Sequence, residues 1–322
     1  MPVIADHVAR VAILIAVYGA LAMAALLLVL VMRRDRKERR AAATQANDRA
    51  LTREIMAALP AGGAPGEAYE RASATDRLAA IAHLGQLMRG EDRARLTAFV
   101  EERHLLDKVL HKLKRRRVAR RVEAVRTLGG VGGAQAIDAL RETLEADRDG
   151  TARLEAAAQL AQLGALPPVG TLVEALQLDQ VAVTPLHHAL FRALAPQRAE
   201  ELRALLAQPV TPAIRALLVD ALGWTEDYSA LPALGEAAGD PDPEVRLEAV
   251  RAGARLDHPA AAPWIVALLD DGDEQVRCAA VRACSTMGLR SALPAIEALR
   301  GDPSAWVRLS AREAAAVLQG AA

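Results

Sequence analysis

The residues that could bind a metal or take part in catalysis are few and scattered. His104, Asp107 and His111 stand at i, i+3 and i+7, a spacing that places them along one face of a helix, where such a trio could touch a metal. No fourth ligand stands near them, so we expect them to be surface residues beside a basic run. His187 and His188 are adjacent, and adjacent residues on a helix point about 100° apart. They do not predict a site.

The other motifs favour structural roles. The segment GGVGG at 129–133 has the composition of a phosphate-binding loop, but it follows a helical pattern instead of a strand, which favours a turn between helices. Cys278 and Cys284 stand six residues apart on one predicted helix and point about 240° apart, which predicts small side chains of the core. The sequence has no Walker A spacing, nucleophile elbow or Cys-x-x-Cys pair. We therefore predict no catalytic residue, no metal ligand and no cofactor.

A basic run at 111–126, HKLKRRRVARRVEAVR, is the strongest local charge signal, with eight lysines and arginines against one glutamate. Three interpretations remain open: a solvated helix surface, a surface that docks on anionic lipid or an acidic protein face, and a nucleic-acid site. The last has the least support, because no aromatic residue interleaves the run to provide a stacking platform. The candidate binding residues are Lys112, Lys114, Arg115, Arg116, Arg117, Arg120 and Arg121.

A repeat of 31 residues is the element that would position these side chains. Asp240, Asp271 and Asp302 recur at this interval; each is followed by Pro or Gly and, six residues later, by Arg. Prolines recur at the same interval upstream, just inside the start of an apolar helical pattern, where a missing N–H costs nothing. Each unit is therefore predicted to be a helix, an Asp turn and a second helix.

The repeat continues toward the N-terminus as its motifs fade. It predicts about six units between residues 96 and 318, with a partial seventh at 71–88. A single helix pair cannot bury its apolar face, so neighbouring pairs must supply the core for one another. The predicted fold is all-α, an α-solenoid of about six to seven helix pairs over residues 67–322.

These units resemble HEAT repeats, in particular the short class called PBS-lyase HEAT-like repeats, as in bacterial membrane-anchored HEAT-repeat proteins. The resemblance covers most of the chain beyond residue 90 and is strongest over 231–318. In that family the turn Asp and the second-helix Arg form a hydrogen-bonded ladder. The resemblance implies an interrupted ladder at Thr184 and Pro185, which replace the Arg motif, and at Arg215, which has Pro209 six residues before it. The implied ladder pairs are Asp147 with Arg153, Asp240 with Arg246, Asp271 with Arg277, and Asp302 with Arg308.

The N-terminal region predicts a membrane anchor. Residues 11–32 contain no charge and would form a helix of about 33 Å, enough to cross a hydrocarbon core of about 30 Å. Basic residues follow this stretch in RRDRKERR at 33–40, whereas only Arg10 precedes it. By the positive-inside rule, the tail 1–10 lies outside and the rest in the cytoplasm, which predicts a single-pass protein of a bacterial inner membrane. The membrane-proximal residues are Arg33, Arg34, Arg36, Lys37, Arg39 and Arg40.

Residues 33–66 should connect the anchor to the solenoid. Leu51, Ile55 and Leu59 are spaced by four on one face of a predicted helix, a stripe that could pair with another helix or extend the membrane helix. The segment PAGGAPG at 60–66 cannot be helical and is predicted to be a flexible hinge. The solenoid would then be tethered with some freedom to reorient.

The expected function is binding. With 322 residues, 52% hydrophobic content and a formal net charge of zero, the chain can bury a large core and is not a globally basic nucleic-acid binder. We expect a membrane-tethered cytoplasmic scaffold that holds a protein partner on its solenoid surface; the resemblance implies an envelope complex of polysaccharide synthesis, secretion or signalling. The alternatives are a HEAT-like enzyme of the bilin lyase or hydroxylase type, which would need converging acids or histidines, and a membrane-associated nucleic-acid binder.

Overall fold

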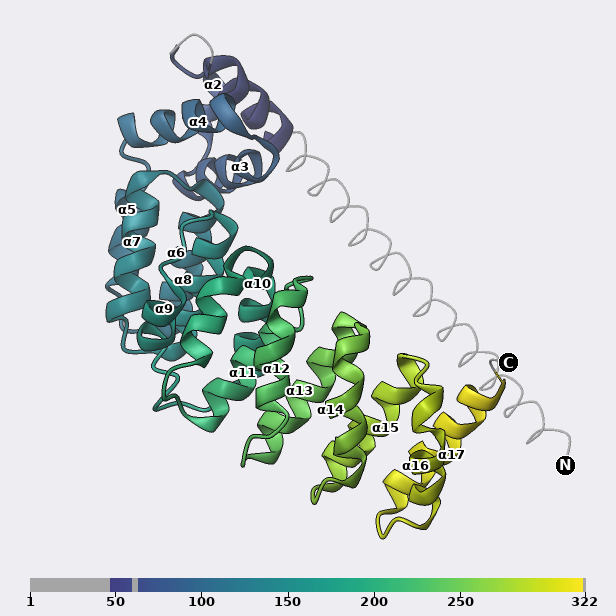
Figure 1. Ribbon diagram of the computed structural model, residues 1–322. Helices are drawn as coiled ribbons and strands as arrows, with labels where there is room; N and C mark the ends of the chain where they lie inside the picture. The colour runs from purple at the N-terminus through teal and green to yellow at the C-terminus, as the bar shows by residue number, and fades with distance from the viewer. Residues whose placement is uncertain (1–46, 60–62, 321–322) are drawn as a thin grey trace, which may run out of the picture. The chain divides into compact units, whose positions relative to one another are not determined.

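The computed structural model describes residues 47–59 and 63–320, which form helices and turns without a strand among them (Figure 1). Two compact units divide the chain, Met1–Leu105 and Leu106–Ala322. The predicted transmembrane helix at 11–32 and the basic segment at 33–40 lie outside the described residues. Within the described part, no helix is long and apolar enough to cross a membrane.

The first unit is a small helical cluster around two aromatic rings. Tyr69 meets Phe99 edge-on with ring centroids 5.9 Å apart, and the guanidinium groups of Arg77 and Arg103 lie 4.3 and 4.0 Å from the centroids of Tyr69 and Phe99, respectively. These stacked pairs bury the polar ends of the arginines against apolar surface. The unit contains a helix over residues 47–58, α2 (Glu67–Arg71), α3 (Ala74–Leu87) and α4 (Gly90–Glu102).

The apolar stripe predicted for the helix before the hinge packs inside this unit. Leu51 and Ile55 are buried, and Leu59 is half-buried. The Glu54 carboxylate on the same helix accepts hydrogen bonds from two backbone N–H groups at the start of α2, the one from Tyr69 at 2.8 Å. Glu54 therefore connects this helix to the start of α2. Residues 60–62 of the hinge predicted at 60–66 lie outside the described residues.

The second unit is a solenoid of seven helix pairs, if α10 is counted in two pairs. The first two pairs are α5 (Asp107–Leu113) with α6 (Val118–Val131) and α7 (Ala134–Ala146) with α8 (Gly150–Gln162). In the next two, α9 (Val169–Ala175) pairs with the first half of α10 (Pro185–Leu206), and the second half of α10 pairs with α11 (Pro212–Leu222). The last three pairs are α12 (Leu231–Ala237) with α13 (Pro243–Leu256), α14 (Ala262–Ala267) with α15 (Glu274–Thr286), and α16 (Leu293–Ala298) with α17 (Ala305–Gly320), the first helix of each pair being named first. Short 3-10 helices flank the later first helices: η1 (Tyr228–Ala230), η2 (Pro259–Ala261), η3 (Leu268–Asp270), η4 (Arg290–Ala292) and η5 (Leu299–Gly301).

Helix α10 bends in the middle and serves two pairs. Pro196 lies inside it, and Arg198 has non-helical dihedral angles of φ −128° and ψ 21°. Proline lacks the N–H of the regular ladder and its ring clashes with the carbonyl four residues before it, which kinks a helix. One continuous segment thereby ends one repeat and begins the next.

The repeat turns explain why the second helices begin where they do. Asp242 and Asp273 are the N-caps of α13 and α15, and each carboxylate accepts a backbone N–H of the first turn at 2.8 Å. Such caps satisfy N–H groups that have no partner within the helix. Pro243 follows at the first position of α13, where proline is favoured.

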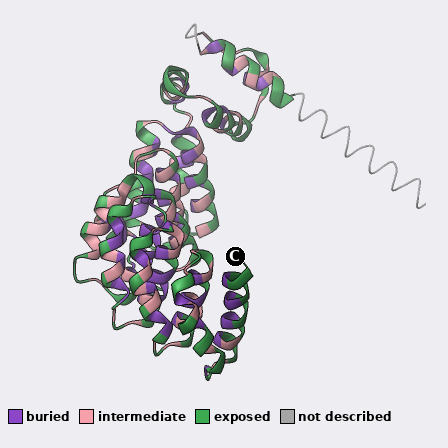
Figure 2. Cartoon of the chain, turned by 45° about the vertical axis from the view of Figure 1, so that its right-hand side comes forward, coloured by how far each residue is buried: buried purple, intermediate pink, exposed green. Residues whose placement is uncertain are grey.

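The buried residues, purple in the cartoon of Figure 2, recur along the helices and form the core. Second helices also pack on one another in sequence, α11 on α13, α13 on α15 and α15 on α17. Small residues allow this close approach. A Cβ at Gly253 would lie 2.2 Å from the ring of Trp264, and a Cβ at Gly223 would lie 2.7 Å from the backbone of Ala252.

Candidate functional site

A ladder of arginines and aspartates runs along the turns of the solenoid. Arg246 donates from Nη1 to the backbone carbonyl of Asp240 in its own unit at 2.9 Å, and from Nε and Nη2 to the Asp271 carboxylate of the next unit at 2.7 and 2.8 Å. Arg277 repeats this arrangement with the carbonyl of Asp271 at 2.7 Å and the carboxylate of Asp302 at 2.8 and 3.0 Å. Each arginine thus joins two units. Within a unit, the arginine contacts only the backbone carbonyl of the aspartate with which the sequence paired it. The carboxylate of that aspartate instead accepts from the arginine of the preceding unit, as Asp271 does from Arg246.

This geometry favours the charged forms. The hydrogen bond from Arg246 lowers the pKa of the Asp271 carboxyl, although partial burial opposes that shift. The hydrogen bond from Arg277 lowers the pKa of Asp302 in the same way. A bidentate guanidinium–carboxylate pair fixes direction as well as distance, so the ladder sets the spacing of consecutive units.

Arg121 belongs to this ladder and not to the basic surface where the sequence placed it. Its Nε and Nη2 donate to the Asp147 carboxylate at 2.7 and 2.9 Å, and its Nη1 donates to the carbonyls of Arg115 and Arg116 at 3.0 and 3.1 Å. Only 5% of its side chain is exposed. Arg121 stands 32 residues before Arg153, one residue off the 31-residue interval, and the run of neighbouring arginines concealed its ladder role.

Within the described residues, the ladder lacks its arginine at one seam, the start of α10, where Thr184 is the N-cap and contacts His187. The interruption is narrower than the sequence implied, because the neighbouring units keep their arginine contacts. Arg153 binds the Asp147 carbonyl and then the amide oxygen of Gln177 at 2.9 Å. The interruption expected at Arg215 is wrong: this arginine donates to the carbonyl of Val210 at 2.9 Å and lies 2.9 Å from the Asp240 carboxylate. The contact within a unit needs only a backbone carbonyl, so a missing aspartate does not break it. At the C-terminal end, Arg308 donates to the carbonyl of Asp302 at 2.7 Å.

A fully buried carboxylate ties α10, α11 and α13 together at this seam. Asp220 on α11 lies 2.7 Å from His188 Nδ1 and accepts from Nε and Nη2 of Arg192 at 2.7 and 3.1 Å, both residues on α10. From α13, Arg255 donates to the Asp220 backbone carbonyl at 3.3 Å and to its carboxylate at 3.4 Å. We call these four residues the Asp220 cluster. It joins three helices where the ladder lacks a link.

Asp220 remains ionised in this setting. Burial by itself raises the pKa of its carboxyl, but hydrogen bonds from His188 and Arg192 and the charges of Arg192 and Arg255 outweigh burial, so the pKa lies below its ordinary value. A carboxylate held by two guanidinium groups is a poor base. The cluster therefore has the chemistry of a structural cross-link.

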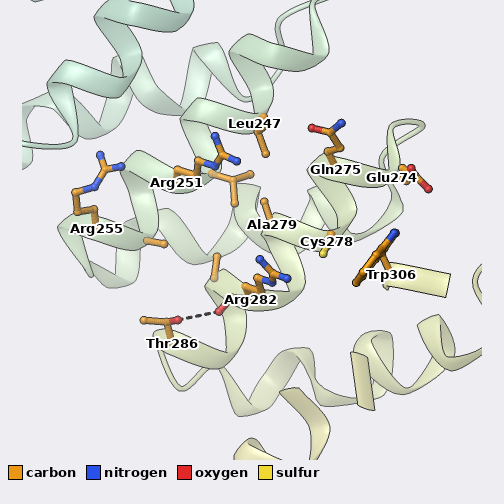
Figure 3. Close-up of a pocket in the computed structure, with 13 residues that line it drawn as sticks. Leu247, Arg251, Arg255, Glu274, Gln275, Cys278, Ala279, Arg282, Thr286 and Trp306 are labelled. Atoms are coloured by element: carbon orange, nitrogen blue, oxygen red, sulfur yellow. Dashed lines mark hydrogen bonds between the residues drawn. The ribbon is translucent and has the colours of Figure 1, made fainter. Parts of the chain in front are cut away.

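A groove of about 560 Å³ lies between α13 and α15 and reaches the start of α17 (Figure 3). The second helices α13 and α15 supply its walls, and an exposed tryptophan of α17 stands at one end. We call it the Arg-Trp groove. It is lined by Leu247, Val250, Arg251, Ala254, Arg255, Glu274, Gln275, Cys278, Ala279, Arg282, Ala283, Thr286 and Trp306.

Arginines dominate the accessible charge of the groove. Arg251 pairs with Glu248 at 2.5 Å and Arg255 with Asp220, and both carboxylates are buried. The guanidinium of Arg282 has no ion pair or hydrogen bond within the described residues, and its side chain is exposed. The acidic partners of Arg251 and Arg255 are buried, and the three guanidinium groups outnumber Glu274, the one carboxylate in the lining of the groove.

Two of the three tryptophans of the chain are exposed beside these arginines. Trp306 is 69% exposed at one end of the groove, and Trp224 is 43% exposed and lies 4.5 Å, centroid to guanidinium carbon, from Arg255. Arg192 of the Asp220 cluster lies 5.5 Å from the same ring. Guanidinium groups stacked on an indole present a flat, partly apolar surface.

The other candidate residues do not converge on a chemical site. Six of the seven basic residues predicted at 112–121 line a hollow of about 640 Å³, namely Lys112, Lys114, Arg115, Arg116, Arg117 and Arg120. The histidine trio does not share one helix, because α4 ends at Glu102 and His104 has a left-handed φ of 50°. Within the described residues, no group of three or more His, Cys, Asp or Glu side chains could hold a metal. His187 is buried, and its ring caps the start of α10.

Sequence reasoning missed the Asp220 cluster and the Arg-Trp groove. A signal for the first was present, since Asp220 stands within the apolar run AIRALLVDAL of a predicted second helix, where a charge must be paired. For the second, the positions of Trp224 and Trp306 in a chain with only three tryptophans were informative. Their exposure could not be read without the helix packing.

The comparisons with known proteins agree with the repeat architecture. A family model for HEAT repeats matches residues 199–261 and 232–316. Residues 199–316 of this chain are HEAT repeats. No curated protein matches its sequence.

Solved structures similar to this chain include human deoxyhypusine hydroxylase, with 20% identity over 86% of this chain and 99% of that chain and a TM-score of 0.34. The complex of CpcE and CpcF of phycocyanin lyase from Nostoc is 23% identical over 65% of this chain and 86% of that chain, with a TM-score of 0.33. A designed armadillo repeat protein in complex with the peptide (KR)4 is 22% identical over 66% of this chain and 99% of that chain, with a TM-score of 0.36.

Proposed function

We propose that this chain is a membrane-tethered scaffold that holds a protein partner in the Arg-Trp groove. The observation that carries the proposal is an exposed Trp306 at the end of a groove lined by Arg251, Arg255 and Arg282, with an exposed Trp224 in the turn after α11 stacked against Arg255. Tryptophan and arginine are the residues that contribute most to binding at protein interfaces. In a chain with only 2% aromatic residues, this concentration supports a binding face.

The charges of the groove support a partner segment that carries acidic and apolar side chains. The carboxylates of Asp220 and Glu248 are buried behind Arg255 and Arg251, and Arg282 has no intramolecular partner among the described residues. An acidic side chain entering the groove would meet guanidinium groups first and could form bidentate pairs with them. Apolar side chains of the same segment would cover the exposed indole rings.

Binding is preferred over catalysis because of the chemistry of the buried carboxylates. Asp220 is held by two arginines and a histidine, and it lies outside the lining of the groove. Such a carboxylate is poorly suited to remove a proton from a substrate. We propose that the partner belongs to an envelope complex and that the repeats lie in the cytoplasm beside an inner membrane, a topology supported by the uncharged stretch 11–32 and the basic residues at 33–40.

Site-specific photocross-linking tests the groove. A cross-linking amino acid at Gln275, which lines the groove, should capture a partner from the native membrane fraction, whereas the same amino acid at Arg300 should not. Mass spectrometry would identify the captured protein, whose affinity for purified variants can then be measured. Capture of the same proteins from both positions would contradict the proposal.

Variants of the groove give the quantitative test. Trp306→Ala and Arg282→Glu should each weaken partner binding by about 30-fold, the loss typical of an interface hot spot, without a change in the melting curve. Leu186→Ala is the matched control, because Leu186 is also exposed but lies outside the groove. Removal of residues 1–40 should release the chain from the membrane and leave the affinity unchanged. Equal binding by Trp306→Ala and wild type would refute the assignment of the groove.

A further inference from the structure

A basic loop between α5 and α6 forms a surface separate from the Arg-Trp groove. We propose that this loop, together with the adjoining ends of α5 and α6, binds the anionic headgroups of the membrane that holds the chain. Its six basic residues are Lys112, Lys114, Arg115, Arg116, Arg117 and Arg120. These six side chains surround one hollow of about 640 Å³. The proposal rests on the membrane tether of the proposed function but not on the identity of the protein partner.

The backbone of the loop is fixed from behind. Arg121 is locked to Asp147 by two hydrogen bonds, and its remaining guanidinium nitrogen holds the carbonyls of Arg115 and Arg116. Arg148 donates to the Arg116 carbonyl as well, at 3.0 Å. Arg121 and Arg148 therefore hold the backbone carbonyls of Arg115 and Arg116, while the side chains at 114–117 remain exposed.

Most basic side chains of the loop make no ion pair within the described residues. Glu123 pairs with Lys112 at 3.3 Å and with Arg120 at 3.2 Å, and Asp138 and Glu142 line a neighbouring hollow with Lys114, Arg115 and Arg116. Lys114 and the arginines at 115–117 are exposed, and their side chains make no ion pair within the described residues. Four of the six charges are thus available to an outside anion.

The composition of the hollow favours a lipid surface over a protein or a nucleic acid. Clusters of four to eight lysines and arginines are typical of segments that bind anionic headgroups. The core of a protein interface is depleted of charge and enriched in aromatic residues, and single-stranded nucleic acids require stacking platforms. All six residues that line this hollow are lysines or arginines, so the site offers charge and little else.

Hydrogen exchange of the full chain in lipid nanodiscs tests the proposal. One set of discs contains only zwitterionic phosphatidylcholine, and a second contains one-third phosphatidylglycerol. We expect amide exchange over residues 112–121 to slow at least about fivefold in the anionic discs, a factor equal to the contribution of one basic residue near an anionic surface. High salt should remove the effect, because it screens the charges.

A charge-matched pair of variants separates the loop from general electrostatics. Arg115→Glu/Arg116→Glu should abolish the slowing in anionic discs, because it reverses two charges that attract the headgroups. The loop should keep its conformation, because its anchoring contacts use backbone carbonyls that the substitutions do not change. Arg300→Glu/Arg312→Glu changes the charge by the same amount at exposed positions outside the loop and should leave the slowing intact. Loss of the slowing in both variants would overturn the proposal.

The tether and the loop fail in different ways. If the chain stays in zwitterionic discs and amide exchange over residues 112–121 is equal in both disc types, the membrane tether is supported and lipid binding by the loop is refuted. Release from zwitterionic discs with retention in anionic discs that depends on Arg115 and Arg116 would refute the tether and support the loop. Slowing that appears in zwitterionic discs only after addition of a membrane-protein extract would assign the loop to a protein partner and overturn the proposal.

Discussion

Replacement of Asp220 by alanine should strongly destabilise the middle of the solenoid. The Asp220 carboxylate is fully buried and accepts from His188 and Arg192 of α10 and from Arg255 of α13. Its removal leaves three donors without their acceptor at the one seam where the ladder has no link. The structure contains no other carboxylate within hydrogen-bond distance of the Arg192 guanidinium among the described residues.

The magnitude follows from the burial of the partners. Breaking a buried ion pair by removal of one member costs about 3–5 kcal/mol. The side chain of Arg192 is 40% exposed and can regain water, so solvent screening reduces its share, and we expect a loss of about 3 kcal/mol. For a unit of this size, that corresponds to a fall of about 6–12 °C in melting temperature.

The pH dependence has a defined sign. Because the pKa of Asp220 is lower in the folded protein than in the unfolded chain, its stabilising contribution is fully present above its unfolded pKa of about 3.9 and is lost as the pH falls through the lower folded value. Asp220→Asn should therefore remove part of the acid destabilisation of wild type below about pH 4.

Urea unfolding followed by circular dichroism, with hydrogen exchange of α10 and α11, would measure the effect locally as well as globally. Asp179→Ala is the matched control, because Asp179 is exposed and lies in the same half of the unit. A loss below about 0.5 kcal/mol for Asp220→Ala, the size of an ordinary surface substitution, would refute the cross-linking role.

Three further substitutions and modifications test the packing. Asp271→Ala should cost about 2–3 kcal/mol in urea unfolding, because it leaves the Arg246 guanidinium without its charged acceptor. Gly253→Ala should lose about 1 kcal/mol, since overpacking against the Trp264 ring at 2.2 Å costs about 1–3 kcal/mol and helix propensity returns about 1 kcal/mol. Burial raises the pKa of Cys284 to about 11, so iodoacetamide at pH 8 should label this thiol only in urea, as mass spectrometry of the peptides would show.

Each of these predictions has an internal comparison. Asp270→Ala removes an exposed carboxylate next to the ladder residue and should change the stability by less than about 0.5 kcal/mol; an equal loss at both positions would contradict the ladder. Gly272→Ala places a Cβ where no atom lies within 4 Å, and equal stability of the two glycine variants would contradict the close helix contact. Labelling of Cys284 in native protein at the rate seen in urea would contradict its burial.

The repeat architecture was predictable because its signals are local and recur. The Asp turn, the helix cap and the Arg six residues after the Asp are all recognisable within a few residues of sequence. Their recurrence every 31 residues, at Asp240, Asp271 and Asp302, predicts a stacked array of helix pairs. The direction of the ladder was not predictable in the same way. Arg246 stands six residues from Asp240 in sequence, yet its carboxylate partner is Asp271 of the next unit, which only the stacking of helices reveals.

The candidate site depended on information that the period does not contain. His188 and Asp220 are 32 residues apart in the stretch where the motif fades, so the loss of the repeat signal concealed a stronger set of contacts. The groove likewise depends on which face of α13 turns toward α15. Neither Arg282 nor Trp306 has a local feature that marks it as part of a shared surface. The basic loop was predictable, because six basic residues within nine positions form a clear charge signal. The burial of Arg121 was not predictable, because it depends on the packing of the helices.

The seam and the groove are physically connected through one arginine. Arg255 holds the buried carboxylate of Asp220 with one side of its guanidinium, lies against Trp224 with its face, and lines the groove. Along the turns, the ladder fixes the spacing of α13 and α15, which are the walls of the groove, whereas at the seam the spacing of α10 and α11 depends on the Asp220 cluster. The arginines of the ladder and those of the groove therefore do different work: the first set holds the wall helices at a constant separation, and the second presents charge to a partner from a surface whose position is already determined.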